Sequence, residues 1–235
     1  IISDLDFQFQ SQIIVRNEII SNKSLFYINN DIQYGSRYIS KRVMDILLII
    51  IFSFIYVPIL LFSIIIIIIL DGFPAVIRQT RVGLHGKSFN MYKLRTMKKN
   101  SHLERDQLQE LNEQSGPLFK IENDPRIIKG TKFLRRLSLD EIPQLLNVLK
   151  GEMSLVGPRP LFPEDNSYFD ENYIRRLNVL PGITGLLQIN ERNTDDFSIW
   201  FKYDLEYIEN WSIILDLKIL LKTPFSILTT KTKGK

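Results

Sequence analysis

The segment ILLIIIFSFIYVPILLFSIIIIIIL, residues 46–70, contains no charged side chain. A straight α-helix of this length would be about 37 Å long, enough to cross a hydrocarbon core of about 30 Å. The segment lies well inside the chain and no small-residue cleavage site follows it, so a cleaved signal peptide is excluded. Hydropathy alone therefore predicts an ordinary transmembrane helix.

Pro58, at the middle of this segment, favours a different geometry. It lacks a backbone N–H and its ring clashes with the carbonyl four residues earlier, so it should kink or break the helix into halves too short to cross alone. Both flanks are positive, which favours the cytoplasmic side for both ends. A re-entrant helix that bends at Pro58 satisfies both facts, and a kinked helix that crosses fully is the alternative. The flanking cations are Arg37, Lys41 and Arg42 on one side and Arg78, Arg81 and Lys87 on the other.

Asp45 lies at the mouth of the apolar run, on the helix face that Lys41 and Arg42 also occupy. A carboxylate near the membrane boundary is costly unless it is paired, so we expect an interfacial salt bridge. Lys41 and Arg42 are also candidates for contacts with lipid phosphates. The predicted membrane-interface residues are therefore Lys41, Arg42, Asp45 and Pro58.

The composition narrows the chemistry. The 235 residues include 30 Lys and Arg against 26 Asp and Glu, a net charge of +4 that suits a phosphate ligand or an acidic lipid surface. The chain has no cysteine, which excludes disulfides, Cys-ligated zinc and thiol catalysis. With only His85 and His102, a serine triad or a His-rich metal site is disfavoured. Any metal should be a hard cation held by carboxylates, and Mg²⁺ is the first candidate.

We divide the chain into three regions. Residues 1–40 are expected to be the strand remnant and linker of a longer protein, residues 41–72 the re-entrant membrane helix, and residues 73–235 a catalytic domain on the cytoplasmic face. The polar segment 101–114 predicts a solvated helix. A further helix over 211–228, which Pro224 should end or kink, suits either the core or the headgroup layer. The predicted fold class is α/β, mainly helical: a membrane-associated monotopic domain with a Pro-broken re-entrant helix, interfacial amphipathic helices and a small sheet.

The stretch RLSLDEIPQLLN, residues 136–147, places two carboxylates, Asp140 and Glu141, side by side. Ser138 and Glu141 match the S-x-x-E capping box, which explains Glu141 without any chemistry. Pro143 would then fall where its missing donor costs stability, so a helix that has Pro143 in its first turn is the alternative. In either register the carboxylates lie at a positive helix end that attracts phosphate.

Several cations and glycine-rich turns, like this acidic pair, are suited to a phosphate ligand. Lys93 and Arg95 lie two apart on one side of a predicted strand, and Arg159 lies in the rigid turn GPRP. Together with acidic residues that could hold a metal, they suit a diphosphate, because phosphoryl transfer requires neutralised oxygens, an in-line nucleophile and a divalent ion. A carboxylate can itself be the nucleophile.

Five motifs, in this order, resemble those of the bacterial sugar transferases, which are monotopic phosphoglycosyl transferases. The motifs are KRVMD before the apolar segment, YKLRTM, FKIENDPRI, SLDEIPQLLNVLKGEMSLVGPRP and PGITGLLQ. The resemblance covers residues 38–228 and is closest to the undecaprenyl-phosphate galactose or glucose phosphotransferases. It implies an enzyme that moves a sugar 1-phosphate from a UDP-sugar to polyprenyl phosphate, releases UMP and initiates surface-glycan synthesis. The implied location is the bacterial inner membrane, with the catalytic domain on the cytoplasmic face.

The resemblance also implies residue roles. Asp140 matches the nucleophile that forms an aspartyl–phosphosugar intermediate, and Glu141 matches a residue that binds the cofactor Mg²⁺. The implied partners are a UDP-sugar, polyprenyl phosphate and membrane lipid, with no nucleic acid, and a homo-oligomer is left open. The substrate-binding candidates are Lys93, Arg95, Arg159, Arg192 and Asp216.

The sequence departs from the family at two positions. Val57 stands where Ser often precedes the proline, and a Ser hydroxyl could satisfy a carbonyl freed at the break, so Tyr56 or the Lys41 region must help instead. Glu191 replaces a frequent Gly, which could alter sugar or nucleotide specificity. Two other classes of protein are the alternatives: a catalytically silent, membrane-anchored scaffold of a glycan-assembly complex, and a bitopic anchor that carries a soluble nucleotide-binding domain.

Overall fold

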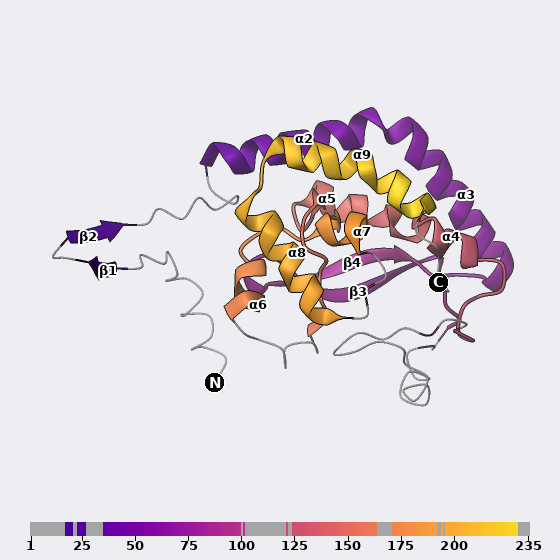
Figure 1. Ribbon diagram of the computed structural model, residues 1–235. Coiled ribbons are helices and arrows are strands. Elements are labelled where there is room, and N and C mark those ends of the chain that lie inside the picture. The colour runs from indigo at the N-terminus through magenta and orange to yellow at the C-terminus, as the bar shows by residue number, and fades with distance from the viewer. Residues whose placement is uncertain are drawn as a thin grey trace.

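The computed structural model describes residues 17–20, 23–26, 35–99, 101, 121, 124–163, 171–191, 194 and 196–229 (Figure 1). Its α-helices are α2 (Gly35–Ile51), α3 (Ser53–Asp71), α4 (Lys132–Arg136), α5 (Leu145–Lys150), α6 (Glu171–Arg176), α7 (Leu186–Asn190), α8 (Phe197–Glu209) and α9 (Ile213–Thr229). Two short 3₁₀ helices are η1 (Leu84–Gly86) and η3 (Leu139–Gln144). The strands form three pairs, antiparallel β1 (Asn17–Ile20) with β2 (Lys23–Phe26), antiparallel β3 (Val76–Val82) with β4 (Ser88–Leu94), and parallel β5 (Ser154–Val156) with β6 (Gly182–Thr184). A mainly helical fold with little sheet is confirmed, whereas the predicted helix over 101–114 lies, apart from Ser101, outside the described residues.

The apolar segment forms two helices that meet at Phe52, and Pro58 lies inside the second of them. At the junction the amides of Ile55 and Tyr56 both donate to the Phe52 carbonyl, at 3.0 and 3.2 Å. Ser53 Oγ donates to the Ile50 carbonyl at 2.8 Å. The predicted location of the break was therefore wrong. Proline disturbs the turn that precedes it, and Ser53 supplies there the hydroxyl that Val57 does not.

The surfaces of α2 and α3 are apolar and exposed. In Figure 1 the two helices run along the top of the molecule and then down its right-hand side. Among the described residues one helix, Ser53–Asp71, is long and apolar enough to cross a membrane, and most of its surface is exposed. Exposed apolar surface of this extent marks a contact with a membrane or with another protein.

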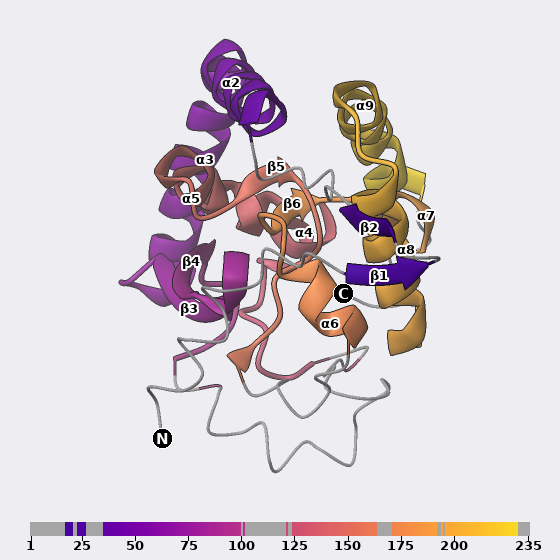
Figure 2. The same ribbon diagram turned by 90° about the vertical axis from the view of Figure 1, so that its left-hand side faces the viewer.

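Helix α9 lies beside α2 at the top of the molecule in two perpendicular views (Figures 1 and 2). Of the two predicted effects of Pro224, the structure excludes an end to the helix, which continues to Thr229. Its inner face buries Ile219, whereas Leu221, Phe225 and Leu228 are exposed. The helix is thus held by packing on one side while the opposite side presents apolar residues to its surroundings.

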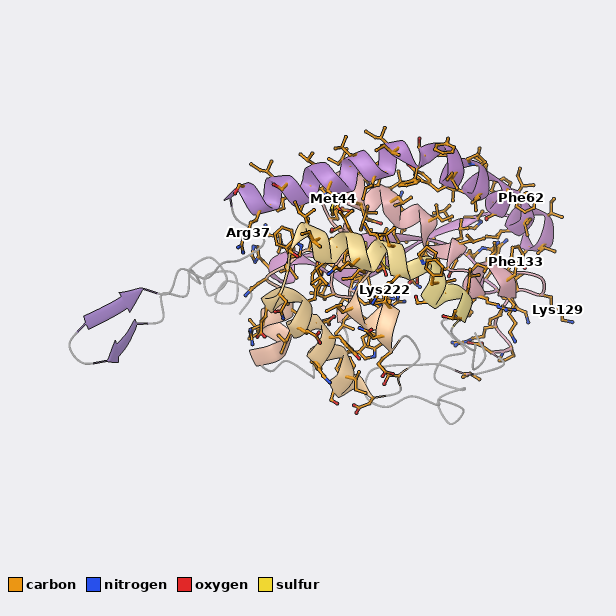
Figure 3. The ribbon with its side chains drawn as sticks, turned by 45° about the horizontal axis from the view of Figure 1, so that its top comes forward. Arg37, Met44, Phe62, Lys129, Phe133 and Lys222 are labelled. Carbon is orange, nitrogen blue, oxygen red and sulfur yellow. The ribbon has the colours of Figure 1, made fainter. Side chains whose placement is uncertain are left out.

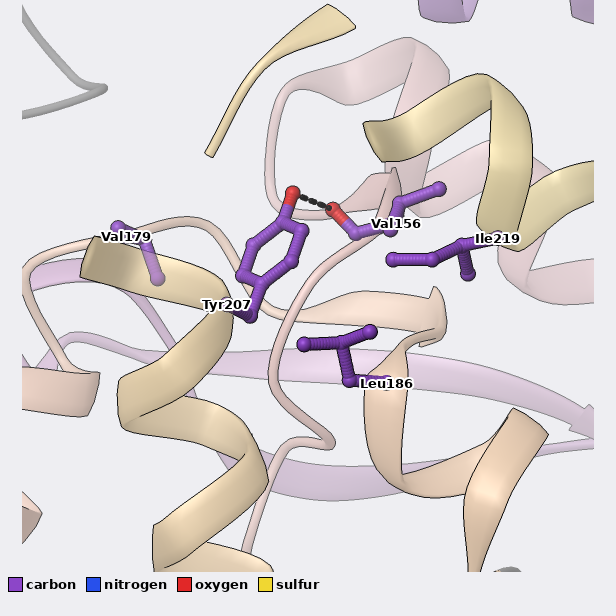
Figure 4. Packing of buried hydrophobic residues seen from close by; sticks show 5 residues of the cluster. All are labelled: Val156, Val179, Leu186, Tyr207 and Ile219. Carbon is purple, nitrogen blue, oxygen red and sulfur yellow. Dashed lines mark hydrogen bonds between the residues drawn. The ribbon is translucent and has the colours of Figure 1, made fainter. Parts of the chain in front are cut away.

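Two apolar clusters join the helices to the strands. In the first, Ile219 meets Tyr207, Val156 and Leu186, which ties α9 to α8, β5 and α7 (Figure 4). In the second, Ile67 of α3 packs with Ala75, Leu94 of β4 and Leu134 of α4. Leu139, the first residue of η3, packs against the second cluster, so the position of the acidic pair depends on α3 as well as on β4.

Two substitutions on one helix test this packing. Ile219→Ala should destabilise the protein by about 2–5 kcal/mol because it leaves a cavity among buried side chains. Leu221→Ala, on the exposed face of α9, removes the same kind of side chain and should cost far less. Thermal unfolding of the detergent-solubilised protein measures both changes, and equal shifts for the two variants would contradict the packing.

Candidate active site

The acidic pair lies on a tight 3₁₀ turn rather than on a regular helix. The turn begins after Ser138, whose φ of 55° is uncommon for a residue other than glycine. The Ser138 side chain does not cap η3, so the capping-box interpretation is wrong, although the Glu141 amide donates to the Ser138 carbonyl at 3.1 Å. Pro143 lies inside this turn, and α5 begins only at Leu145.

Lys93 lies between the two carboxylates. Its Nζ is 3.0 Å from Asp140 Oδ2 and 3.6 Å from Glu141 Oε1. Asp140 is 3 % exposed and Glu141 is 9 % exposed. Two neighbouring buried carboxylates repel each other and lose hydration, so a cation between them is needed to stabilise the pair. The structure thus brings three predicted site residues together.

Asn147, which the sequence analysis did not select, fixes the strand that carries Lys93. Its Oδ1 accepts from the Tyr92 amide at 3.0 Å, and its Nδ2 donates to the Asn90 carbonyl at 2.8 Å. The same Nδ2 donates to Glu152 Oε2 at 2.7 Å. Asn147 is fully buried, and a lone amide within the apolar run LLNVL was the only sequence signal for it.

Arg159 also reaches the acidic pair, through Glu141. Both its Nη1 and Nη2 lie 3.4 Å from Glu141 Oε1. The turn that carries Arg159 is held by backbone contacts with β6 and its flanks: the Gly157 amide donates to the Thr184 carbonyl and the Gly182 amide donates to the Pro158 carbonyl, at 2.9 and 2.8 Å. A Cβ on Gly182 would lie 2.0 Å from the Gly157 nitrogen, so only glycine permits this approach.

Three consecutive carbonyls hold the Arg159 turn in place. The Arg159 carbonyl accepts from Arg176 Nη2 at 2.7 Å. The next two carbonyls accept from Arg81 Nη1 at 3.2 Å and from the Val82 amide at 3.0 Å. Arg176 is itself buried against Asp204, at 2.7 Å. Burial raises the pKa of Asp204 above its usual range, although the Arg176 guanidinium opposes that rise.

Arg95 lies elsewhere. Its guanidinium binds the Asp71 carboxylate and donates to the carbonyls of Gly72 and Pro74, both at 2.6 Å. The expectation that Arg95 shares the Lys93 face is therefore wrong, because β4 ends at Leu94 and its alternation does not extend further. Arg95 instead fixes the chain where α3 ends.

Asp216 and Lys41 form a buried pair that joins α9 to α2, with Lys41 Nζ 2.7 Å from Asp216 Oδ2. The Tyr207 hydroxyl lies 2.9 Å from Asp216 Oδ1, and Trp211 Nε1 donates to Oδ2 at 3.1 Å. Burial, together with the Asp216 charge, raises the pKa of Tyr207 well above its usual range, which keeps the phenol protonated. Lys41 is 1 % exposed, so the expected contact of its ammonium with lipid phosphate is wrong.

Asp45 and Arg42 also face the protein. Asp45 Oδ2 lies 4.0 Å from Arg42 Nη1 and accepts from Ser154 Oγ at 2.7 Å. Arg42 Nη2 donates to the Val148 carbonyl at 2.7 Å. The predicted pairing of Asp45 with Arg42 is present, and it connects α2 to β5 and α5 inside the protein.

The donor set at the acidic pair suits magnesium. No group of three or more acidic or histidine side chains that could hold a metal is found within the part of the chain that the structure describes. Mg²⁺, however, commonly takes one or two carboxylates and completes its shell with water and substrate phosphates. Asp140 and Glu141 therefore fit such an ion. Arg192, the remaining candidate, lies outside the described residues.

Paired carboxylates faced by Lys93 and Arg159, beside two helices with exposed apolar surfaces, have the charge arrangement that a phosphate ligand requires. The family model for bacterial sugar transferases matches residues 36–230. The chain therefore belongs to the bacterial sugar transferase family, as the motifs predicted.

Three relatives illustrate the range of the family. An uncharacterized sugar transferase of Haemophilus influenzae is 41 % identical over 94 % of this chain and 45 % of its own length. The undecaprenyl-phosphate galactose phosphotransferase of Salmonella typhimurium is 36 % identical with the same two coverages, 94 % and 45 %. The UDP-glucose:undecaprenyl-phosphate glucose-1-phosphate transferase of Caulobacter vibrioides is 38 % identical over 81 % of this chain and 70 % of its own. The chain thus spans under half the length of the first two relatives.

The contact between Arg176 and the Arg159 carbonyl predicts a coupled effect. Arg176→Lys keeps the charge but shortens the donor, so Arg159 should shift and the reaction at the acidic pair should slow by about tenfold to a hundredfold. In an Arg159→Ala background the same change should cost little, because the group that it positions is gone. Steady-state rates of the four proteins in this double-mutant cycle give the coupling.

The neighbouring Arg175 supplies a matched control. It pairs with Glu209 on the surface, where both side chains are about half exposed, so Arg175→Lys should leave the rate unchanged. Equal losses from Arg176→Lys in both Arg159 backgrounds would show that Arg176 has a general structural role only.

Proposed function

We propose that this protein is a polyprenyl-phosphate sugar-1-phosphate transferase, which moves a sugar 1-phosphate from a UDP-sugar to undecaprenyl phosphate and releases UMP. The observation that carries the proposal is the buried Asp140–Glu141 pair with Lys93 and Arg159 directed at it. Its relatives from Salmonella and Caulobacter, as named above, support the substrate classes. Such a transfer would be the initiating step of surface-glycan synthesis.

The proposed reaction has two displacements at one phosphorus. In the first, an Asp140 carboxylate oxygen attacks the sugar-bearing phosphorus, the new O–P bond replaces the P–O bond to UMP, and UMP leaves with that bonding pair. In the second, an oxygen of the lipid phosphate attacks the same phosphorus and Asp140 leaves as a carboxylate. Lys93 and Arg159 lie where they can neutralise the phosphate oxygens in both steps.

We further propose that Glu141 holds a Mg²⁺ ion at this site. When bound, the ion would supply positive charge to the diphosphate oxygens of the donor. The residues of this chain contribute the rest: Lys93 orients the nucleophile through its contact with Asp140, and Arg159 holds the Glu141 carboxylate in place.

The proposed location is the cytoplasmic face of the bacterial inner membrane. The exposed apolar surfaces of α2 and α3 support insertion as a re-entrant pair that bends near Phe52. Ion pairs tie both ends of this helix pair to the same body, a buried one through Lys41 near the start of α2 and a partly exposed one through Asp71 at the end of α3. The exposed apolar face of α9 suits the headgroup layer.

UMP release from a panel of UDP-sugars with polyprenyl phosphate and Mg²⁺ tests the chemistry. Asp140→Asn should reduce the rate by about a thousandfold or more, because an amide cannot serve as the nucleophile. Chelation of divalent ions should also abolish release. Lys93→Ala should be severely impaired, whereas Lys98→Ala, which removes an exposed lysine from the same stretch, should not be.

Two results would contradict the proposed chemistry. One is full UMP release by Asp140→Asn, and the other is activity that survives chelation. A chain that is inactive on every UDP-sugar but binds a partner protein of glycan assembly would instead support the scaffold alternative.

Cysteine labelling tests the re-entrant geometry, since the chain has no cysteine of its own. Ser36→Cys lies near the start of α2 and Lys87→Cys follows η1, and both positions are exposed. In membrane vesicles of known orientation, an impermeant maleimide should label both cysteines from the cytoplasmic side only. Labelling from opposite sides would establish the bitopic alternative.

A further inference from the structure

The short helix α4 directs apolar side chains both inward and outward. Leu134 is fully buried and packs against Ile67 of α3. Its neighbours Phe133 and Leu137 are 40 % and 37 % exposed. The loop before α4 touches the end of α3, since a Cβ on Gly130 would lie 3.1 Å from Leu70 Cδ1. The outward face of α4 therefore adjoins the exposed apolar surface of α3.

Three exposed cations lie among these apolar side chains. Residues 129–137 contain no acidic residue. Asp71 and Asp124 form ion pairs with Arg95 and Arg126. Figure 3 shows Phe133 and Lys129 at the same end of the molecule as Phe62 of α3, with Arg37 at the opposite end. We define the α4 patch as Lys129, Lys132, Phe133, Arg136 and Leu137.

We propose that the α4 patch binds the phosphate headgroups of anionic phospholipids. The patch combines an aromatic residue with cations beside an apolar helix. Such a combination suits the boundary between hydrocarbon and headgroups, where cations meet the negative surface of the membrane. The position of the patch matches this boundary, because it adjoins the last turn of α3, where the apolar segment ends. The inference rests on the membrane location in the proposed function and is independent of the chemistry.

The α4 patch lies next to the acidic pair. Ser138 follows it directly, and Leu139, the first residue of η3, packs in the same cluster as Leu134 and Ile67. Seating α4 among headgroups would fix the depth of Asp140 relative to the lipid surface. Anionic phospholipid would then set the height at which a membrane-bound phosphate meets the nucleophile.

A depth measurement tests the proposal without substrate. Leu137→Cys, labelled with an environment-sensitive fluorophore, keeps all three cations and Phe133 in place. The protein is placed in nanodiscs of phosphatidylcholine with increasing phosphatidylglycerol, and quenching by lipids that carry a spin label near the headgroup is recorded. Quenching should rise with phosphatidylglycerol and fall at high salt, since screening shortens the range of the attraction.

A charge-matched pair of variants isolates the patch. Lys129→Gln/Arg136→Gln should raise the phosphatidylglycerol fraction needed for half-maximal quenching by about fivefold per lost cation, the equivalent of about 1 kcal/mol each. Lys98→Gln/Lys202→Gln removes two exposed lysines outside the α4 patch and should leave the curve unchanged. Circular dichroism confirms that each variant is folded, and the salt dependence of the protein that carries Leu137→Cys alone, with all patch cations in place, provides a second measurement.

Three outcomes would overturn the proposal: equal quenching in neutral and anionic nanodiscs, the same shift from both variant pairs, or an effect of polyprenyl phosphate in neutral nanodiscs that phosphatidylglycerol does not reproduce. The last outcome would make the α4 patch a site for the acceptor lipid alone. Because quenching needs no turnover, a failure here and full activity of Asp140→Asn are separate results that refute separate proposals.

Discussion

Two adjacent carboxylates buried in a protein repel each other and lose their hydration, and the cations that compensate for this organise the centre of the molecule. Lys93 comes from β4 and Arg159 from the turn after β5, so two separate strands are required at fixed positions relative to η3. The surrounding contacts serve that requirement. Asn147 holds the backbone beside Lys93, and Arg176 holds the carbonyl of Arg159.

A second set of buried charges connects the apolar helices to this centre. The pair of Lys41 and Asp216 joins the start of α2 to α9, and Arg95 with Asp71 fixes the end of α3. Breaking either pair would leave an uncompensated buried charge, which is far more costly than the loss of an exposed pair. The helix pair is therefore attached to the body at both ends by ion pairs that would be costly to break if the helices shifted. This geometry suits a hairpin that enters and leaves a membrane on one side.

The residues of the candidate site could be predicted from the sequence more successfully than the residues that they contact. Asp140, Glu141 and Arg159 could be selected because their motifs place charge at turns, and Lys93 because its strand motif carries cations. The structure brings these four together. Arg95 could not be assigned from strand alternation, since the strand ends one residue before it. In the sequence, Lys41 has the position of a cation that flanks a membrane segment. Its burial follows only from its contact with Asp216, which lies far along the chain. Local patterns report charge and periodicity, whereas pairing across the fold decides which charges remain at the surface.

The charge at the acidic pair also bears on how a substrate would enter. Two carboxylates face two cations, so the cluster of Asp140, Glu141, Lys93 and Arg159 is formally neutral without any ligand. A diphosphate adds negative charge that these cations, already shared with the carboxylates, do not balance. The divalent ion proposed at Glu141 would supply that balance. Lys93 would then orient Asp140 through its existing contact while it also faces the phosphate oxygens. Lys93 would therefore both stabilise the carboxylate pair before substrate binds and neutralise phosphate afterwards.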